Sequence, residues 1–248
     1  MKIAVLSDIH GNLLALESVL EDIQERGCEK ILFLGDYALA GPEPGDTVNL
    51  CMSLKEHDNV EMIQGNTDKM IADYSEDLYE SLSKVAPVMA NALREEAKNL
   101  SKPQLEFLRN LPYQKELEID GVKILMVHGS PRRNNEDILP DTPLSDVEEM
   151  LNGVEADLVL CGHTHLPCGF QTTTKQTVVN DGSVGRPFTD NPESCYVIIS
   201  TTGNGGFEVE HNFVKYDNLQ AAKTLAARGF DGADKLANNL IHSTARHF

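Results

Sequence analysis

The 248-residue sequence is short of positive charge: its 21 Lys and Arg residues face 39 Asp and Glu residues, for a formal net charge of −18. A field of this sign repels nucleic acid and anionic lipid, so a protein that binds a long phosphate backbone or a membrane surface is disfavoured. A small anionic ligand stays compatible with the composition, because bound divalent cations would reverse the local potential inside an acidic shell.

The sequence also lacks paired cysteine motifs and long apolar runs. Its five cysteines are an odd number without Cys-x-x-Cys spacing, which argues against a disulfide framework and fits a reducing cytoplasm. No stretch approaches the roughly 20 apolar residues of a membrane span, and no basic start precedes an apolar run as in a signal peptide. We therefore expect a cytoplasmic protein with one domain over residues 1–248.

The chain opens on a short apolar run, residues 3–6, which is typical of a buried strand. Asp8 and His10 follow this run. Because they are two residues apart, they should project together from the carboxyl end of the strand. Asn12 is placed to cap the helix that the apolar spacing predicts over residues 13–26. A carboxylate and an imidazole at one strand end form half of a metal site.

The same arrangement recurs along the chain. Apolar runs at residues 31–34 and 60–63 alternate with helical segments, an order that predicts a parallel sheet with right-handed crossovers. Two similar runs occupy residues 124–127 and 158–161. Ligand sites of open α/β sheets lie at the carboxyl ends of the strands, so we expect the polar groups after these runs to gather there. These groups are Asp8, His10, Asp36, Asn66, His128, His163 and His165.

The remaining sequence adds helices and further strands. Residues 68–111 are predicted to be helical. They either form a partial lid over the sheet edge or pack on the side of the domain, and we favour packing on the side. Ser101 begins a capping box within this segment, and Asp120-Gly121 predicts a hairpin turn. The other predicted elements are helices at residues 47–56 and 144–151, strands at residues 177–179, 195–199 and 207–214, and a C-terminal helical tail over residues 217–248.

Five motifs in this order resemble those of the calcineurin-like metallophosphoesterases, and most closely those of the small prokaryotic YfcE-like phosphoesterase group, over about residues 1–200. The motifs are Asp8-x-His10, Gly35-Asp36, Gly65-Asn66, His128-Gly129 and Gly162-His163-x-His165. The resemblance implies an α/β fold, a four-layer α-β-β-α sandwich of two mixed sheets. It also implies a pair of divalent metal ions that activate a bridging hydroxide for the hydrolysis of phosphoester bonds.

The resemblance assigns roles to these residues. One metal is held by Asp8, His10 and His165, the other by Asn66, His128 and His163, and Asp36 bridges the two. Asp36, Asn66 and His128 carry the catalysis, and Asn12, Arg132 and Arg133 are expected to contact the substrate. Mixed nitrogen and oxygen ligands suit Mn, Fe, Zn, Ni or Co, and we favour Mn or Fe. Outside these roles we expect Cys161 to be a small buried hydrophobe, and we expect surface or packing positions for His57, His211, His242 and His247.

Two departures from the family pattern narrow the function. Many members have a histidine after Gly-Asn that protonates the leaving group and is oriented by the next aspartate; here Thr67 precedes Asp68. No arginine follows Tyr37 at the position typical of protein phosphatases, which disfavours phosphoprotein substrates. We expect hydrolysis of phosphodiesters or nucleotide polyphosphates with good leaving groups.

Three alternatives stay open. One is a metal-binding interaction scaffold with little catalysis, of the kind seen in a retromer subunit of similar fold. The second is a phosphomonoesterase. The third, a nuclease, is opposed by the charge. The sequence is also compatible with a homo-oligomer.

Overall fold

The computed structural model describes residues 1–242, which form ten strands and nine helices. The strands make two five-stranded sheets. The first sheet contains β1 (Lys2–Leu6), β2 (Lys30–Phe33), β3 (Val60–Met62), β9 (Ser194–Thr201) and β10 (Phe207–Val214), in the spatial order β10-β9-β1-β2-β3. The second contains β4 (Lys115–Ile119), β5 (Val122–Met126), β6 (Leu158–Cys161), β7 (Cys168–Gln171) and β8 (Thr177–Asn180), in the order β4-β5-β6-β8-β7.

Both sheets are mixed. In the first sheet β1 runs parallel to β2 and antiparallel to β9, and in the second β6 runs parallel to β5 and β8 while β4 and β7 are antiparallel edge strands. Apolar side chains from both sheets, among them Val5, Leu32, Ile124 and Leu160, form one buried cluster. The two sheets therefore pack face to face. This packing removes the apolar face of each sheet from water.

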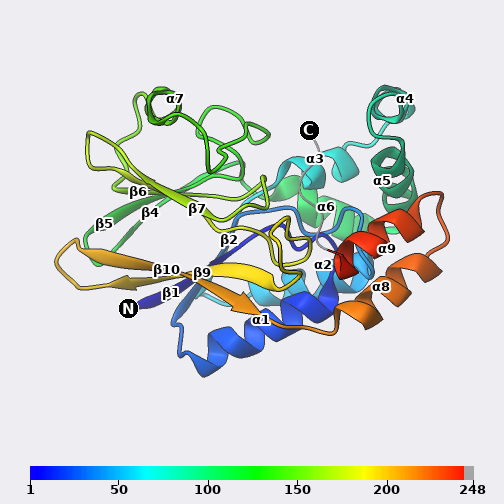
Figure 1. Ribbon diagram of the computed structural model, residues 1–248, viewed down its shortest axis with the longest axis horizontal. Helices are drawn as coiled ribbons and strands as arrows, with labels where there is room; N and C mark the ends of the chain where they lie inside the picture. Colours follow the sequence, from blue (N-terminus) through cyan, green and yellow to red (C-terminus); the bar gives the residue numbers. More distant parts are fainter. Residues whose placement is uncertain (243–248) are drawn as a thin grey trace.

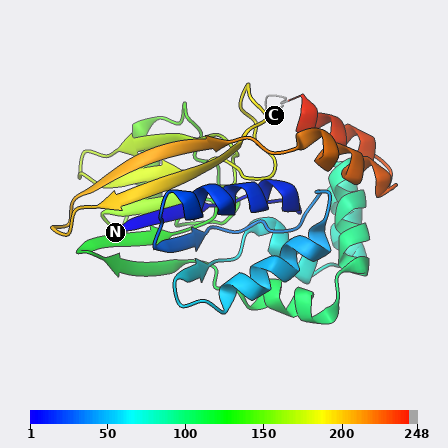
Figure 2. The ribbon, with the colours of Figure 1, turned by 90° about the horizontal axis from the view of Figure 1, so that it is seen from below.

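Helices cover the outer faces of the two sheets (Figure 1). The first sheet and the adjoining end of the molecule carry α1 (Leu13–Glu25), α2 (Pro44–Lys55), α3 (Asn66–Ala72), α4 (Glu76–Ser83), α5 (Pro87–Asn99), α6 (Lys102–Asn110), α8 (Asn218–Ala227) and α9 (Ala233–Ile241). The second sheet carries α7 (Leu144–Met150), whose Val147 and Met150 pack against its outer residues. Figure 2 shows α1 lying along the first sheet. The four-layer sandwich that the resemblance implied is confirmed.

The local predictions hold with small shifts at the element ends. The segment predicted as residues 68–111 contains α3 to α6, and its Leu93 and Leu108 belong to the core beside the first sheet. Ser101 forms the expected capping box with Gln104. The sequence did not reveal β7, a four-residue edge strand with a glycine at its second position. The tail predicted over residues 217–248 contains α8 and α9, and its residues 243–248 lie outside the described residues.

All five cysteines are free. Cys161 is fully buried at the end of β6, and its thiol donates to the carbonyl of Val179. Within residues 1–242, none of the helices combines the length and apolarity that crossing a membrane requires.

Candidate metal centre

The strand ends of the two sheets meet at one edge of the sandwich. Asp8 and His10 follow β1, Asp36 follows β2, His128 follows β5 and His165 follows β6. Their side chains form two groups whose ligand atoms lie within 4.8 Å of one another. One group is Asp8, His10 and His165, and the other is Asp8, Asp36 and His128; all five residues are buried. Asp8 belongs to both groups, so the two candidate sites are adjacent and share this residue.

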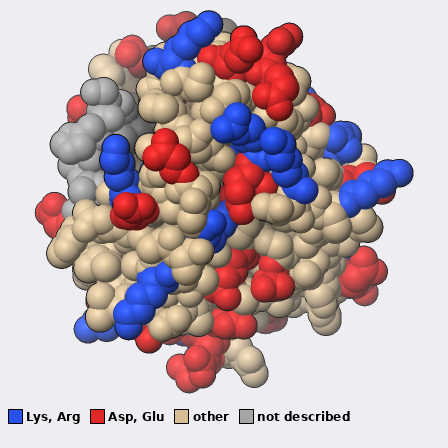
Figure 3. All heavy atoms as spheres, turned by 90° about the vertical axis from the view of Figure 1, so that its right-hand side faces the viewer, with Lys and Arg blue, Asp and Glu red and all other residues tan. Residues whose placement is uncertain are grey.

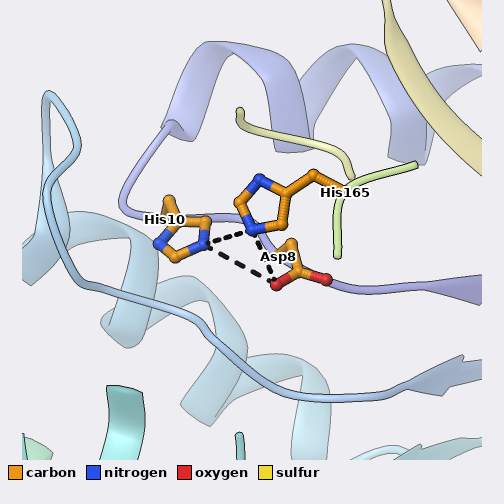
Figure 4. A group of neighbouring side chains, drawn as sticks. All are labelled: Asp8, His10 and His165. Carbon is orange, nitrogen blue, oxygen red and sulfur yellow. Dashed lines mark hydrogen bonds and ion pairs between the residues drawn. The ribbon is translucent and has the colours of Figure 1, made fainter. Parts of the chain in front are cut away.

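The first group converges on one carboxylate oxygen (Figure 4). Nε2 of His165 lies 3.2 Å from Oδ1 of Asp8, and Nε2 of His10 lies 3.7 Å from the same oxygen. The two Nε2 atoms are 3.1 Å apart. His10 also faces the second group, because its Nε2 lies 3.8 Å from Oδ2 of Asp36.

The second group is built around His128. Its Nε2 lies 3.4 Å from Oδ2 of Asp36, 3.9 Å from Oδ1 of Asp8 and 3.0 Å from Oδ1 of Asn66. Asn66 is the first residue of α3, directly after the loop that leaves β3. Three oxygens from three different strand ends thus surround one imidazole nitrogen.

Backbone carbonyls fix which nitrogen of each histidine faces the centre. Nδ1 of His10 lies 2.7 Å from the carbonyl of Leu39, and Nδ1 of His128 lies 2.8 Å from that of Leu34. Nδ1 of His165 lies 2.6 Å from the carbonyl oxygen of Arg186. A carbonyl only accepts, so each Nδ1 carries a hydrogen and each Nε2 of the neutral ring points a lone pair inward. This is how histidine ligands are oriented around metals.

A cation fits this arrangement. The Nε2 lone pairs of His10 and His165 face each other at 3.1 Å, which is repulsive unless a proton or a metal ion lies beside them. Oδ1 of Asp8 is buried and has no hydrogen-bond partner among the described residues, whereas its Oδ2 accepts from the hydroxyl of Ser7 and the amide of His163. A buried carboxylate oxygen left unpaired costs free energy that a metal ion would recover. The residues present therefore suit divalent ions.

The backbone around the site is strained. Eight described residues other than glycine have a positive φ, and five of them are predicted metal ligands: Asp8, His10, Asp36, His163 and His165. Each such residue costs of order 1–3 kcal/mol unless local hydrogen bonds relieve it, and such residues cluster at functional sites.

Two glycines permit the close approach of neighbouring loops. A Cβ on Gly65 would lie 2.0 Å from Oδ1 of Asp36, and a Cβ on Gly162 would lie 2.2 Å from Oγ of Ser7 and 2.6 Å from Oδ2 of Asp8. Only a residue without a side chain lets these backbones lie against the carboxylates. The glycines in the motifs Gly65-Asn66 and Gly162-His163 are therefore packing requirements of the centre.

Hydrogen bonds from the next loop hold Asp36 in place. Oδ1 of Asp36 accepts the backbone N–H of Thr67 at 2.9 Å. The carboxylate of Asp68 accepts three backbone N–H groups, from Asp36 and Gly65 at 2.8 Å and from Tyr37 at 2.9 Å. Burial and the nearby charge of Asp36 raise the pKa of Asp68 to about 7 against these three donors. Asp68 thus ties the Asp36 loop to the start of α3, rather than orienting a histidine.

Opposite charges tune the titration of the metal-free centre. Burial raises the pKa of Asp36, but the charge and hydrogen bond of His128, together with the charge of His10, outweigh it and hold the pKa at about 2. Burial lowers the pKa of His128, but Asp36 and Asp8 raise it to about 10. Burial lowers the pKa of His165 to about 4 in spite of Asp8. The metal-free centre at neutral pH thus holds ionised carboxylates, a neutral His165 and a protonated His128.

One predicted ligand lies beside the two groups rather than within them. Nε2 of His163 is 3.3 Å from Oδ1 of Asp137, and its ring stands edge-on to that of His128 with the centroids 5.3 Å apart. Asp137 was not anticipated from the sequence. It lies in an irregular loop between β5 and α7, where no strand end or motif marks it.

The residues expected to contact substrate have other partners in this structure. Asn12 is buried and caps α1 through the amide of Ala15, while its own Nδ2 donates to the carbonyl of Gly185 and the hydroxyl of Tyr216. Its capping role is confirmed, and its polar atoms are already engaged.

Arg132 and Arg133 both pair with a carboxylate. Each donates to Glu136, at 2.8 and 3.0 Å, and Arg132 also pairs with Glu149 of α7 at 3.2 Å. Arg132 lines a groove of about 690 Å³ between the β4–β5 hairpin and the end of α7. That groove contains none of the predicted metal ligands.

The other histidines stand apart from the centre. His57, His211 and His242 belong to neither group, and Nε2 of His211 bonds to the carbonyl of Asn180. His247 lies outside the described residues.

Comparison with known proteins identifies the family. The profile of the calcineurin-like phosphoesterase superfamily domain matches residues 1–204. The chain belongs to this superfamily. It is 32% identical over 235 residues to the uncharacterized protein MJ0912 of Methanocaldococcus jannaschii, covering 88% of this chain and 89% of the relative. It is 28% identical over 194 residues to phosphodiesterase YfcE of Escherichia coli K12, covering 78% and 85%.

A solved structure has the same fold as this chain. The crystal structure of the hypothetical protein PH1004 from Pyrococcus horikoshii OT3 aligns with a TM-score of 0.85 at 25% identity, covering 98% of this chain and 99% of that one. A calcineurin-like phosphoesterase domain with clustered Asp and His side chains accounts for the geometry described above: the chain is a member of a hydrolase superfamily, and it holds residue groups that suit metal ions.

Proposed function

We propose that this protein hydrolyses small phosphodiesters or nucleotide polyphosphates, using two divalent transition-metal ions held at the candidate metal centre. The observation that carries the proposal is the convergence of three Nε2 atoms, from His10, His128 and His165, on the oxygens of Asp8 and Asp36. The name of the relative YfcE, a phosphodiesterase, supports a diester substrate.

The donor set suits borderline metals. Imidazole nitrogen with carboxylate and amide oxygen favours Mn, Fe, Co, Ni or Zn over Mg or Ca, and we favour Mn or Fe. One ion would be held by Asp8, His10 and His165, and the other by His128, Asn66 and His163, with Asp36 between them. In the second set, Asn66 already faces Nε2 of His128 at 3.0 Å.

The protein's own groups set the geometry and charge of the reaction. Two bound ions would supply an activated water and neutralise charge on the phosphoryl oxygens. The carbonyls of Leu34 and Leu39 orient His128 and His10. The N–H of Thr67 and the glycine at position 65 hold Asp36 against the segment that joins β3 to α3.

The absence of an acidic side chain at Thr67 supports substrates with good leaving groups. Thr67 is 7% exposed, and its Oγ1 has no hydrogen-bond partner among the described residues. A hydroxyl is a poor acid at neutral pH, so it does not replace the general acid that is worth about 10²–10⁴-fold. Leaving oxygens that are stable anions, such as a nitrophenolate or a nucleotide phosphate, depend least on that help.

One face of the molecule is consistent with a small substrate rather than a long polyanion. On the face that carries the α5 and α9 end, the Lys and Arg side chains of the described residues lie among Asp and Glu and form no continuous basic stripe (Figure 3). Long nucleic acids need such a stripe to replace their counterions.

A substrate panel tests the proposal. The purified protein is stripped with a chelator, loaded with Mn²⁺ and given bis(p-nitrophenyl) phosphate, p-nitrophenyl phosphate and a dinucleoside polyphosphate. We expect kcat/KM for the diester to exceed that for the monoester by at least about tenfold. Faster turnover of the monoester would assign a phosphomonoesterase, and no turnover of any substrate with either Mn²⁺ or Fe²⁺ bound would contradict the proposal.

A further inference from the structure

The loop after β8 places an arginine beside the metal centre. The backbone of Arg186 is fixed on both sides: its carbonyl accepts from Nδ1 of His165 at 2.6 Å, and its N–H donates to Oγ of Ser183 at 2.9 Å. The amide of the preceding residue, Gly185, donates to the carbonyl of Asp8 at 2.9 Å. Arg186 therefore cannot move away from these two metal-ligand residues without breaking the bonds that orient them.

The guanidinium of Arg186 is one aromatic ring away from a predicted ligand. The ring of Phe188 stacks on that of His165, with centroids 4.7 Å apart and planes inclined by 11°. The guanidinium carbon lies 5.6 Å from the centre of the Phe188 ring, and Nη1 lies 3.4 Å from Sδ of Met89 in α5. An aromatic ring on one side and a thioether on the other hold the side chain without neutralising it.

The charge of Arg186 is uncompensated. Within residues 1–242, no carboxylate lies within ion-pair distance of its guanidinium. Arg132, Arg133 and Arg228, in contrast, each pair with at least one glutamate. Burial lowers the pKa of Arg186 to about 10, so the group still carries its charge at neutral pH. In a chain with a net charge of −18, an unpaired and partly desolvated cation beside the metal centre is an unusual feature.

A phosphate oxygen is the partner that this group fits best. The planar guanidinium offers two parallel N–H donors that match two oxygens of one phosphate, and its weak hydration lets it bind in a partly buried position. Its contacts with Phe188 and, through its backbone, with His165 put it on the His165 side of the centre. A substrate with one phosphate would be held by the metal ions alone and would leave Arg186 unpaired.

We propose that Arg186 binds a second phosphate of the substrate, adjacent to the one that is hydrolysed, and thereby selects nucleotide polyphosphates over simple phosphodiesters. The proposal rests on the proposed function for the position of the scissile phosphate. It makes Arg186 a specificity-determining residue, supported by Phe188 and Met89, and replaces Arg132 and Arg133 as the expected phosphate contact.

A comparison of two substrates tests the selection. The Mn²⁺-loaded wild type, Arg186→Gln and Arg186→Lys are assayed with diadenosine tetraphosphate and with bis(p-nitrophenyl) phosphate. We expect the ratio of the two kcat/KM values to fall by about 10- to 100-fold in Arg186→Gln, mainly through KM, as for loss of a charge-assisted hydrogen bond. The ratio for Arg186→Lys should lie between those of the wild type and Arg186→Gln, since lysine keeps the positive charge but lacks the two parallel N–H donors.

Arg94→Gln is the matched control, because Arg94 also stacks on an aromatic ring, at 3.9 Å from the centre of Tyr79, outside the metal centre. Its ratio should match that of the wild type. If the ratio of the two kcat/KM values is the same in the wild type and in Arg186→Gln, and circular dichroism shows both proteins to be folded, the proposal is overturned.

A binding measurement separates this proposal from the proposed function. Calorimetry follows pyrophosphate and orthophosphate binding to each Mn²⁺-loaded protein, so no turnover is needed. We expect wild type to bind pyrophosphate at least about tenfold more tightly than Arg186→Gln, with a smaller difference for orthophosphate. If the wild type turns over no ester but shows this difference, the proposed function fails and the role of Arg186 stands. If esters are turned over and pyrophosphate affinity is unchanged by the substitution, the role of Arg186 fails alone.

Discussion

Oδ2 of Asp36 lies 3.4 Å from Nε2 of His128, although the strands that present these two residues belong to different sheets. The contact exists only because β2 and β5 end at the same edge of the sandwich. Asp36 reaches across that edge to His10 as well, at 3.8 Å. Like Asp8, Asp36 is thus a carboxylate of the first sheet that contacts a histidine of the second sheet, and it is the first residue to change.

Asp36→Asn should empty both metal sites together. The substitution preserves the volume of the side chain and the oxygen that accepts from Thr67, but removes the negative charge between His10 and His128. We expect fewer than one bound ion per chain after dialysis and a loss of turnover of at least about 100-fold. Asp58→Asn, at an exposed position, is the control and should keep wild-type metal content. Two ions retained in Asp36→Asn would show that Asp36 does not join the sites.

Metal binding should release a proton from His128. Burial lowers its pKa, but Asp36 and Asp8 raise it to about 10 in the metal-free protein, so at pH 7 the ring is protonated and the metal must displace that proton. Apparent affinity for the ion at this site should therefore rise with pH, by up to about tenfold per unit, and level off near pH 10. Calorimetry at pH 7 in buffers of different ionisation enthalpy should give about one proton released. No released proton at pH 7 would mean that His128 is already neutral there.

Thr67→His should change which leaving groups the enzyme tolerates. An imidazole at this position would add the proton donor that many relatives carry, within the range of about 10²–10⁴-fold for acid catalysis. Rates for a series of aryl phosphodiesters should depend steeply on leaving-group pKa in the wild type and less steeply in Thr67→His. Thr67→Val, which keeps the shape and removes the unpaired hydroxyl, should retain the steep slope. Equal and shallow slopes in wild type and Thr67→His would mean that another group already donates the proton.

Arg228 should stabilise the metal centre from a distance. Its Nη1 donates to Oε1 of the buried Glu96 at 2.8 Å, the same oxygen accepts the N–H of Ala40 at 2.9 Å, and the neighbouring carbonyl of Leu39 orients His10. Arg228→Ala removes the cation beside the buried Glu96, whose pKa burial already raises, so the variant must either protonate Glu96 or bury its charge unpaired. The free energy of unfolding should fall by about 3–5 kcal/mol. Loosening of the loop should also weaken metal binding by about tenfold.

Urea denaturation and metal titration of the Arg228 variants check both effects. The double variant Glu96→Gln with Arg228→Met removes both charges and should recover most of the stability. If Arg228→Ala matches the wild type in both measurements, the loop does not depend on this ion pair.

Arg132 and Arg133 should contribute little to substrate binding. Both donate to Glu136, whose pKa the hydrogen bonds from Arg132, Ser130 and Arg133 lower to about 2, so the pairs persist over the working pH range. We expect Arg132→Ala and Arg133→Ala each to change KM by less than about threefold, because both guanidinium groups pair with Glu136 and the groove that Arg132 lines contains none of the predicted metal ligands. Steady-state kinetics decide this, and a rise of more than about tenfold in either variant would restore that residue as a phosphate contact.

The sequence predicted the parts of this molecule that depend on local pattern. The apolar runs before Asp8, Asp36 and His128 form strands because short buried runs fit a sheet covered on both faces. The cap at Asn12 follows from the bonding of its side chain to the first turn of α1. These signals lie within a few residues of each other, so one sequence suffices to read them.

The remaining features depend on contacts between distant segments. Arg186 lies beside Phe188 and Met89, and within residues 1–242 no carboxylate pairs with it; no sequence spacing reveals these relationships. Asp137 meets His163 only through the path of the irregular loop between β5 and α7. The engagement of Asn12 with Gly185 and Tyr216 likewise joins segments that no periodicity connects.

The number of metal ions that restore activity tests the account most directly. Chelator-stripped protein is titrated with Mn²⁺ while bound metal and hydrolysis of bis(p-nitrophenyl) phosphate are measured on the same samples. The account predicts that activity is absent without metal, rises with binding and reaches its maximum at two ions per chain. Binding that stops at one ion, or full activity in the stripped protein, would contradict a dinuclear phosphodiesterase.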